Sequence, residues 1–174
     1  GASVTDFDAV RAMVQQAADA WGRVDILVNN AGILRDKSFA KMELDDFKLV
    51  VDVHLMGAVN CIKAVWETMR AQNYGRIVMT TSSSGLFGNF GQANYGAAKT
   101  GLIGLMNVLA LEGARRGILV NALAPTAATR MTDGLLGDLA ERFDPQHVAA
   151  VATFLASERC TLTKHILTAG GGRV

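Results

Sequence analysis

The chain has 174 residues, of which half are hydrophobic and 19% are charged, and its formal net charge is +1. This length suits one domain with a sizeable core, and the composition is that of a globular protein. The chain has no basic stripe and its uninterrupted apolar runs are short, so neither nucleic acid nor a membrane is an expected partner.

Short apolar runs alternate along the chain with longer segments of helical periodicity. The first helical pattern begins at Phe7 with Asp6 as its cap, and an apolar strand follows over residues 25–28. The later elements are a helix over 45–70, a strand over 75–81, a helix over 94–115, a strand over 118–123, a helix opened by Asp144 and Pro145, and a strand over 165–168.

This alternation predicts the α/β class, as a single domain over residues 1–174 with a mostly parallel sheet covered by helices on both faces. A Rossmann-like doubly wound sheet carries a G-x-G-x-x-G turn after its first strand, and the sequence contains no such turn. The strand at 26–28 is apolar on both faces, which predicts a central position, because an apolar edge would invite aggregation. We therefore expect that the first strands and the glycine-rich turn, on the order of 60 residues, belong ahead of Gly1.

Polar motifs follow three of the predicted strands. Residues 29–32 read Asn-Asn-Ala-Gly, Ser82 follows the second strand, and residues 121–125 read Asn-Ala-Leu-Ala-Pro. Tyr95, thirteen residues after Ser82, forms a Y-x-x-x-K pattern with Lys99. This pattern alone is common, but four motifs in this order and spacing resemble the short-chain dehydrogenase/reductase family over nearly the whole chain.

The Y-x-x-x-K pair suits proton transfer. Two residues four apart lie on one face of a helix, so the Lys99 ammonium can approach the Tyr95 phenol. A nearby cation favours the phenolate, which predicts a lowered pKa for Tyr95. Tyr95 can then exchange a proton with a substrate alcohol while Ser82 holds the substrate oxygen. The alternative for such a pair by itself is a packed ring and a solvated amine.

The resemblance implies further site residues and a nicotinamide cofactor, NAD or NADP, with NAD favoured. His54 stands where most of the family has an asparagine that anchors a proton-relay water, so it is a fourth catalytic candidate; a histidine that only packs in its helix is the alternative. No metal cluster is visible, and the separated Cys61 and Cys160 indicate reduced core thiols in a cytoplasmic protein. The cofactor-binding residues that the resemblance implies are Asn30, Ala31, Gly32, Tyr95, Lys99, Pro125, Ala128 and Thr129.

Three further patterns resemble one branch of the family, the (3R)-hydroxyacyl-CoA dehydrogenase domain of multifunctional β-oxidation enzymes. They are His-Leu-x-Gly at residues 54–57, the stretch 88–95, and A-P-x-A-x-x-R-M-T at 124–132. This implies oxidation of a 3-hydroxyacyl thioester, a substrate loop from Met131 onward that contains Gly134 and Gly137, and a homodimer or homotetramer formed through the two long helices. Two alternatives stay open: a 3-oxoacyl-thioester reductase that uses NADPH, and a non-catalytic remnant that acts as an oligomerisation or interaction module.

Overall fold

The computed structural model describes residues 1–129, 132 and 137–174, and within them it shows one sheet of four parallel strands in the order β1-β2-β3-β4. The strands are β1 (Ile26–Asn29), β2 (Gly75–Thr80), β3 (Ile118–Pro125) and β4 (Ile166–Ala169). The helices are α1 (Phe7–Trp21), η1 (Phe39–Lys41), α2 (Leu44–Val51), η2 (Asp52–Met56), α3 (Gly57–Gln72), α4 (Ser83–Phe87), α5 (Ala93–Gly113), η3 (Ala114–Arg116), η4 (Gly137–Arg142) and α6 (Pro145–Ala156). The predicted α/β class is confirmed.

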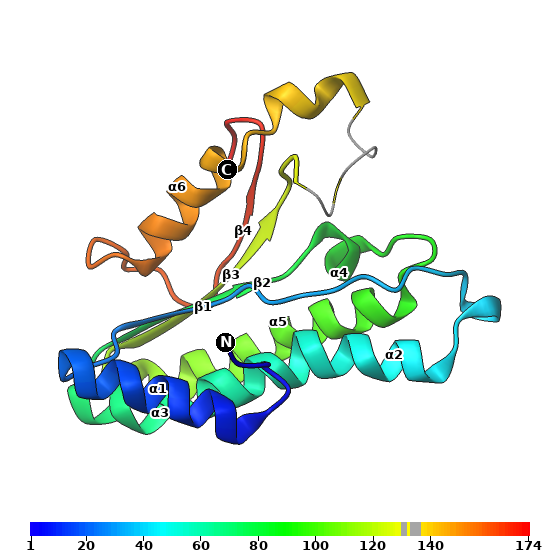
Figure 1. The fold of residues 1–174 in the computed structure, drawn as a ribbon. Helices are drawn as coiled ribbons and strands as arrows, with labels where there is room; N and C mark the ends of the chain where they lie inside the picture. The colour runs from blue at the N-terminus through cyan, green and yellow to red at the C-terminus, as the bar shows by residue number, and fades with distance from the viewer. Residues whose placement is uncertain (130–131, 133–136) are drawn as a thin grey trace.

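Helices cover both faces of the sheet, with α1, α3 and α5 on one side and α6 on the other (Figure 1). Successive side chains of a strand point to opposite faces. Accordingly, Ile77 and Met79 of β2 pack with α3 and α5, whereas Val78 packs with α6. Since the four strands follow one another in a single direction across the sheet, the crossover through α6 has the opposite hand to those through α3 and α5.

The strand β1 lies at the edge of this four-stranded sheet, and its predicted central position requires the strands expected ahead of Gly1. Ile26 and Val28 are 49% and 47% exposed, whereas the side chains of β2 are almost all buried. The apolar composition of β1 is typical of a strand with both faces buried, but two of its apolar side chains, Ile26 and Val28, are about half exposed here. An exposed apolar edge of this kind offers a template for pairing with another strand.

Two predicted helix starts are confirmed by their caps. The Asp6 side chain accepts a hydrogen bond from the backbone N–H of Ala9 at 3.0 Å, and α1 follows it. Asp144 accepts from the N–H of Gln146 at 2.8 Å, with Pro145 in the first turn of α6. Carboxylates at these positions satisfy N–H groups that the helix itself leaves without partners.

The long helix predicted over residues 45–70 is interrupted in the structure. Its regular part α2 ends at Val51, the π-helical turn η2 follows, and α3 begins at Gly57. A π turn accommodates one extra residue, so it changes which side chains face the sheet beyond it, and such turns are frequent at functional sites. His54 lies within this turn and is 4% exposed.

The combined helix over Leu44–Gln72 is long and apolar enough to cross a bilayer, with a mean hydropathy of 1.4 in its most apolar window. Short apolar runs in the sequence predicted no such segment. Length and composition alone are weak evidence for a membrane span, because the core helix of a globular domain has the same properties. Here Ile62, Val65 and Met69 of α3 are buried against the sheet.

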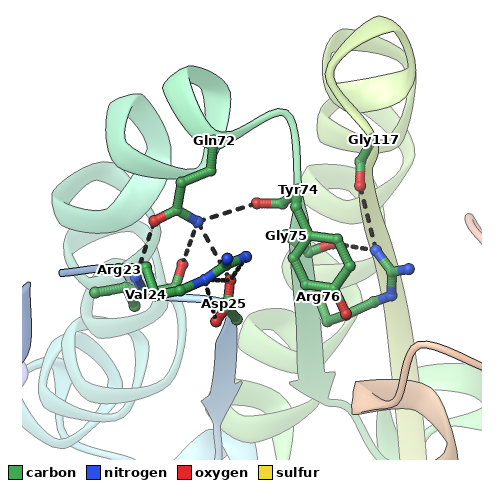
Figure 2. Close-up of polar contacts among 8 residues, drawn as sticks. All are labelled: Arg23, Val24, Asp25, Gln72, Tyr74, Gly75, Arg76 and Gly117. Carbon is green, nitrogen blue, oxygen red and sulfur yellow. Dashed lines mark hydrogen bonds and ion pairs between the residues drawn. The ribbon is translucent and has the colours of Figure 1, made fainter. Parts of the chain in front are cut away.

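A polar cluster fastens the amino-terminal ends of β1 and β2 to the end of α3 (Figure 2). The Gln72 side chain accepts from the N–H of Val24 at 2.9 Å and donates to its carbonyl at 3.0 Å, so it pairs with the backbone as a neighbouring strand would. Arg76 is 8% exposed, and its guanidinium carbon lies 4.3 Å from the centroid of the Tyr74 ring. Its hydrogen-bond acceptors are the carbonyls of Gly75, Gly117 and Ser157.

Candidate active site

The four predicted catalytic residues gather at the opposite, carboxyl-terminal end of the sheet. The strand β2 ends at Thr80, and the chain turns into the short helix α4, which the sequence patterns did not predict. Ser82 is the N-cap of α4, and its hydroxyl oxygen accepts from the N–H of Ser84 at 3.2 Å. Serine is favoured at this position because its oxygen satisfies a free N–H group. The cap fixes the Ser82 side chain at the end of the strand.

Tyr95 enters the site from the first turn of α5. Asn94, which is fully buried, holds this turn in place: its Oδ1 accepts from the Tyr95 N–H at 2.7 Å and its Nδ2 donates to the Arg35 carbonyl at 3.0 Å. A side-chain hydrogen bond joins Tyr95 to Ser82. The structure therefore brings together the hydroxyl and the phenol that the spacing in the sequence had paired.

Lys99 lies one helical turn beyond Tyr95 and is 4% exposed. Its Nζ donates to the Thr80 carbonyl at 2.5 Å and lies 5.3 Å from the centroid of the Tyr95 ring. Burial lowers the pKa of Lys99 to about 8. The approach of α4 makes this burial possible, because a Cβ at Gly85 would lie 2.7 Å from the Cβ of Lys99.

The predicted lowering of the Tyr95 pKa is wrong for the protein by itself. Burial raises the pKa of Tyr95, the hydrogen bond from Ser82 lowers it, and the negative charge of Asp36 raises it further. Removal from water opposes the phenolate, and this effect outweighs the help that the phenolate receives from its neighbours. Tyr95 is therefore a neutral phenol at neutral pH, ready to donate a proton.

His54 reaches the same site from the π turn. Its Nε2 lies 3.1 Å from the backbone nitrogen of Ile33 and 2.8 Å from the Ile33 carbonyl oxygen. Its ring meets the Tyr95 ring edge-to-face, with 5.0 Å between centroids and 86° between planes. Burial, together with the positive charge of Lys99, lowers the pKa of His54 to about 4.

The Asn-Asn-Ala-Gly turn follows β1 and lies beside these side chains. The Asn30 Oδ1 accepts from the Thr80 hydroxyl at 3.0 Å, which ties the turn to the end of β2. A cavity of about 160 Å³ opens between the turn, α1 and α3, and its polar lining includes Asn29, His54 and Lys99. Among the described residues, the buried Asn29 Nδ2 and His54 Nδ1 atoms have no hydrogen-bond partner.

The other predicted cofactor-binding residues follow β3 at the same edge of the sheet. Pro125 ends β3 and pairs with Ala169 of β4, and the Ala128 N–H donates to the Phe143 carbonyl at 2.7 Å. The Thr129 N–H is bonded to the hydroxyl of Thr132 at 2.8 Å. The predicted substrate loop falls largely on residues 130–131 and 133–136, which lie outside the described part.

Several residues that shape the site carried no signal in the sequence. Thr80 accepts from Lys99 and donates to Asn30, and the buried Thr81 hydroxyl donates to the Lys99 carbonyl at 2.9 Å. The roles of these two threonines depend on the packing of β2 against α5, which no local sequence pattern reveals. Asn94 is different, because its position next to Tyr95 could have identified it as a site residue. Within residues 1–129, 132 and 137–174, no group of three or more His, Cys, Asp or Glu residues could hold a metal ion.

Comparisons with known proteins agree with this geometry. The family described as short chain dehydrogenase matches residues 1–138. The chain is 52% identical over 164 residues to peroxisomal multifunctional enzyme type 2 of Drosophila melanogaster, and 46% identical over 176 residues to the mouse protein of that name. It is 41% identical over 183 residues to a 3-oxoacyl-[acyl-carrier-protein] reductase of Synechocystis. The solved full-length Drosophila enzyme superposes with a TM-score of 0.79 at 43% identity.

The chain corresponds to only part of the multifunctional relatives. The alignments cover 92% of this chain but 27% of the Drosophila protein, and 99% of this chain but 24% of the mouse protein. The structural match covers 94% of this chain and 28% of the Drosophila enzyme. The Synechocystis reductase is covered more fully, at 74% of its length for 99% of this chain.

Proposed function

The chain belongs to the short-chain dehydrogenase/reductase family, and we propose that it interconverts a secondary alcohol and a ketone with a nicotinamide cofactor. One observation carries this proposal: the Ser82 hydroxyl, the Tyr95 phenol and the buried Lys99 ammonium converge at the carboxyl end of β2. Two O–H groups beside one cation can hold a carbonyl or alcohol oxygen and exchange its proton.

Each of these side chains has a distinct role in the proposed reaction. A nicotinamide, when bound, would supply the hydride acceptor for oxidation of the alcohol and the hydride donor for reduction of the ketone. In reduction, Tyr95 donates its phenolic proton to the substrate oxygen, and in oxidation the phenolate takes that proton back. Ser82 donates a hydrogen bond to the same oxygen and holds it in place, while the Lys99 charge stabilises the phenolate.

The residues present fit the nicotinamide end of such a cofactor. Within the part of the chain that the structure describes, Lys99 Nζ donates one hydrogen bond, to the Thr80 carbonyl. Its other N–H groups are therefore available for ribose hydroxyls. A Cβ at Gly32 would collide with His54, so the turn keeps a bare backbone where a cofactor can approach. The proposed contacts are Asn30, Ala31, Gly32, Tyr95, Lys99, Pro125, Ala128 and Thr129. No residue is proposed for the diphosphate, because the sequence contains no G-x-G-x-x-G turn.

The proposed substrate is a 3-hydroxyacyl thioester, and the proposed cofactor is NAD. Support comes from the Drosophila and mouse relatives, which are multifunctional enzymes by name, and from the branch-specific pattern around His54. The relationship to the Synechocystis 3-oxoacyl reductase favours the second candidate, reduction of a 3-oxoacyl thioester with NADPH. Both reactions use the same three side chains and differ in cofactor and direction.

We also propose a homodimer or homotetramer. α5 exposes Val108 and Leu111, at 53% and 69%, on the side away from the sheet. Apolar side chains of this size on a helix already covered on its other face suit a second packing surface. A cytoplasmic location is a proposal that rests on Cys61 and Cys160, both of which are free thiols.

Hydride transfer tests the proposal directly. We expect reduction of NAD with a (3R)-3-hydroxyacyl-CoA, and markedly slower reduction with the (3S) enantiomer or with NADP. Faster oxidation of NADPH by a 3-oxoacyl thioester would favour the reductase instead. A folded, self-associating protein without hydride transfer in any of these assays would favour the non-catalytic interaction module.

A further inference from the structure

We propose that His54 is a positioning residue, whose imidazole holds the turn at residues 29–32 and the Tyr95 ring in one fixed arrangement. The ring is 4% exposed and lies between these two parts of the site. It can reach both because the π turn η2 carries it. The kinetic part of this proposal rests on the proposed function, whereas the structural part does not.

The first contact joins His54 to the backbone of Ile33, directly after the turn. A neutral imidazole carries its proton on one nitrogen only. With the proton on Nε2, the ring donates to the Ile33 carbonyl at 2.8 Å; without it, Nε2 accepts from the Ile33 N–H at 3.1 Å. The same residue therefore holds the ring in either neutral tautomer. This anchors the chain that leaves Gly32.

The second contact is the edge-to-face packing of His54 on Tyr95, with 5.0 Å between ring centroids. Such an arrangement is a favoured geometry for two rings, because the edge of one meets the electron-rich face of the other. The first turn of α5 fixes the backbone of Tyr95 through Asn94, and His54 limits where its ring can lie. One rigid side chain thus touches both the turn and the proposed proton donor.

Gly32 provides the space that the ring needs. A Cβ at Gly32 would lie 2.3 Å from His54 Cε1 and 3.1 Å from each ring nitrogen. Gly32 does not have a positive φ, so its backbone could accept another residue. The imidazole, and not backbone strain, therefore requires glycine here. Gly32 and His54 form a matched pair.

Passage of protons through His54, the role predicted from the sequence, fits these contacts less well. Among the residues that the structure describes, its Nε2 faces only the backbone groups of Ile33, which do not titrate, so these residues offer no onward acceptor for a proton taken up at Nδ1. A charged ring would also lie near the Lys99 ammonium, and the lowered pKa of His54, about 4, keeps it neutral at pH 7.

A double-mutant cycle tests the structural part without any activity. Gly32→Ala is compared in the parent and in a His54→Ala background by denaturant unfolding. We expect a clear drop of the unfolding midpoint in the parent and little or none in the background, because removal of the ring opens the space. An equal drop in both would overturn the pairing. Gly104→Ala, whose Cβ would meet nothing within 4 Å, is the control and should behave alike in both.

Three substitutions test the kinetic part. The amide of His54→Gln reaches the position of Nε2 and keeps the bond to Ile33, whereas His54→Asn ends near Nδ1 and His54→Phe has no polar atom. We expect the Gln variant to keep turnover close to the parent, and the Asn and Phe variants to lose about a hundredfold, the usual effect of a small misplacement. His147→Gln, on an exposed histidine of α6, is the matched control.

The pH dependence of these variants separates positioning from proton relay. Positioning predicts an unchanged pH profile for the Gln variant. Equal loss in the Gln and Asn variants, with an altered pH profile, would overturn the proposal, since neither amide titrates. If the parent shows no hydride transfer, the proposed function fails, and the unfolding cycle by itself decides the role of His54.

Discussion

Burial controls the protonation of the two central side chains. The sequence predicted a lowered Tyr95 pKa because a lysine lies four residues away, but removal from water raises this pKa and outweighs the opposing hydrogen bond with Ser82. The same removal lowers the pKa of Lys99 to about 8. Residue types and spacing identify which side chains meet. They do not show how deeply those side chains are buried, because this depends on the close approach of α4 at Gly85.

Lys99→Met should change how stability depends on pH. The pKa of Lys99 is about 8 in the fold, against an ordinary value of 10.5 for a lysine in water. Between these values the unfolded chain binds more protons than the folded one, so the parent gains stability as pH rises, by about 3 kcal/mol in all. The variant lacks this gain. Urea unfolding of both proteins across the window measures it, and parallel curves would show that the amine is not held in a buried site.

Ser82→Ala should lower kcat by a factor of roughly 10² to 10³, the usual effect of removing one donor to a reacting oxygen. The neighbouring Ser83→Ala is the matched control, because Ser83 is exposed and should leave kcat unchanged. Steady-state rates of the two variants, with circular dichroism to confirm folding, decide the matter. Equal losses in the two variants would mean that the Ser82 hydroxyl has no specific role in turnover.

At the scale of elements, local chemistry predicted most of the fold. The caps Asp6 and Asp144 and the apolar strand runs act within a few residues, so their positions can be found from the sequence. The π turn at Asp52–Met56 could not be found, because its extra residue leaves the apolar spacing on either side nearly intact. His54 could therefore be placed in the right helix, but not in the right orientation or with the right partners.

Gln72→Leu should destabilise the fold without affecting the site. The change removes the paired hydrogen bonds to Val24 ahead of β1 and leaves two backbone groups without their side-chain partner (Figure 2). We expect a loss of about 1–3 kcal/mol in the free energy of unfolding. Gln16→Leu, at an exposed position of α1, is the control. A Gln72 variant as stable as this control would mean that the cluster contributes no stability.

At the scale of the whole molecule, the two ends of the sheet have different roles, one in stability and one in the candidate site. Its amino-terminal end carries the Gln72 and Arg76 bonds that hold the layers together, and its carboxyl-terminal end carries the side chains of the site. The composition of β1 shows how apolar the strand is, but not which strands are its neighbours. The meeting of the motifs that follow the strands could be predicted, because parallel strands bring their carboxyl ends to one edge of the sheet.

Leu111→Glu should weaken self-association. The substitution places a charge on the exposed side of α5 and leaves the sheet-facing core residues unchanged. We expect the variant to be monomeric at micromolar concentration while the parent is a dimer or tetramer, as measured by sedimentation. Trp21→Glu, on the exposed side of α1, should not alter the assembly. A parent that sediments as a monomer would refute the proposed oligomer.

The central claim is that Tyr95 transfers the proton during alcohol–ketone interconversion, and the turnover of Tyr95→Phe tests it most directly. Phenylalanine keeps the ring beside His54 and Lys99 and removes only the hydroxyl. We predict that kcat with NAD and a (3R)-3-hydroxyacyl-CoA falls by roughly 10² to 10⁴ while the unfolding midpoint stays near that of the parent. A variant that turns over at the parental rate would contradict the account.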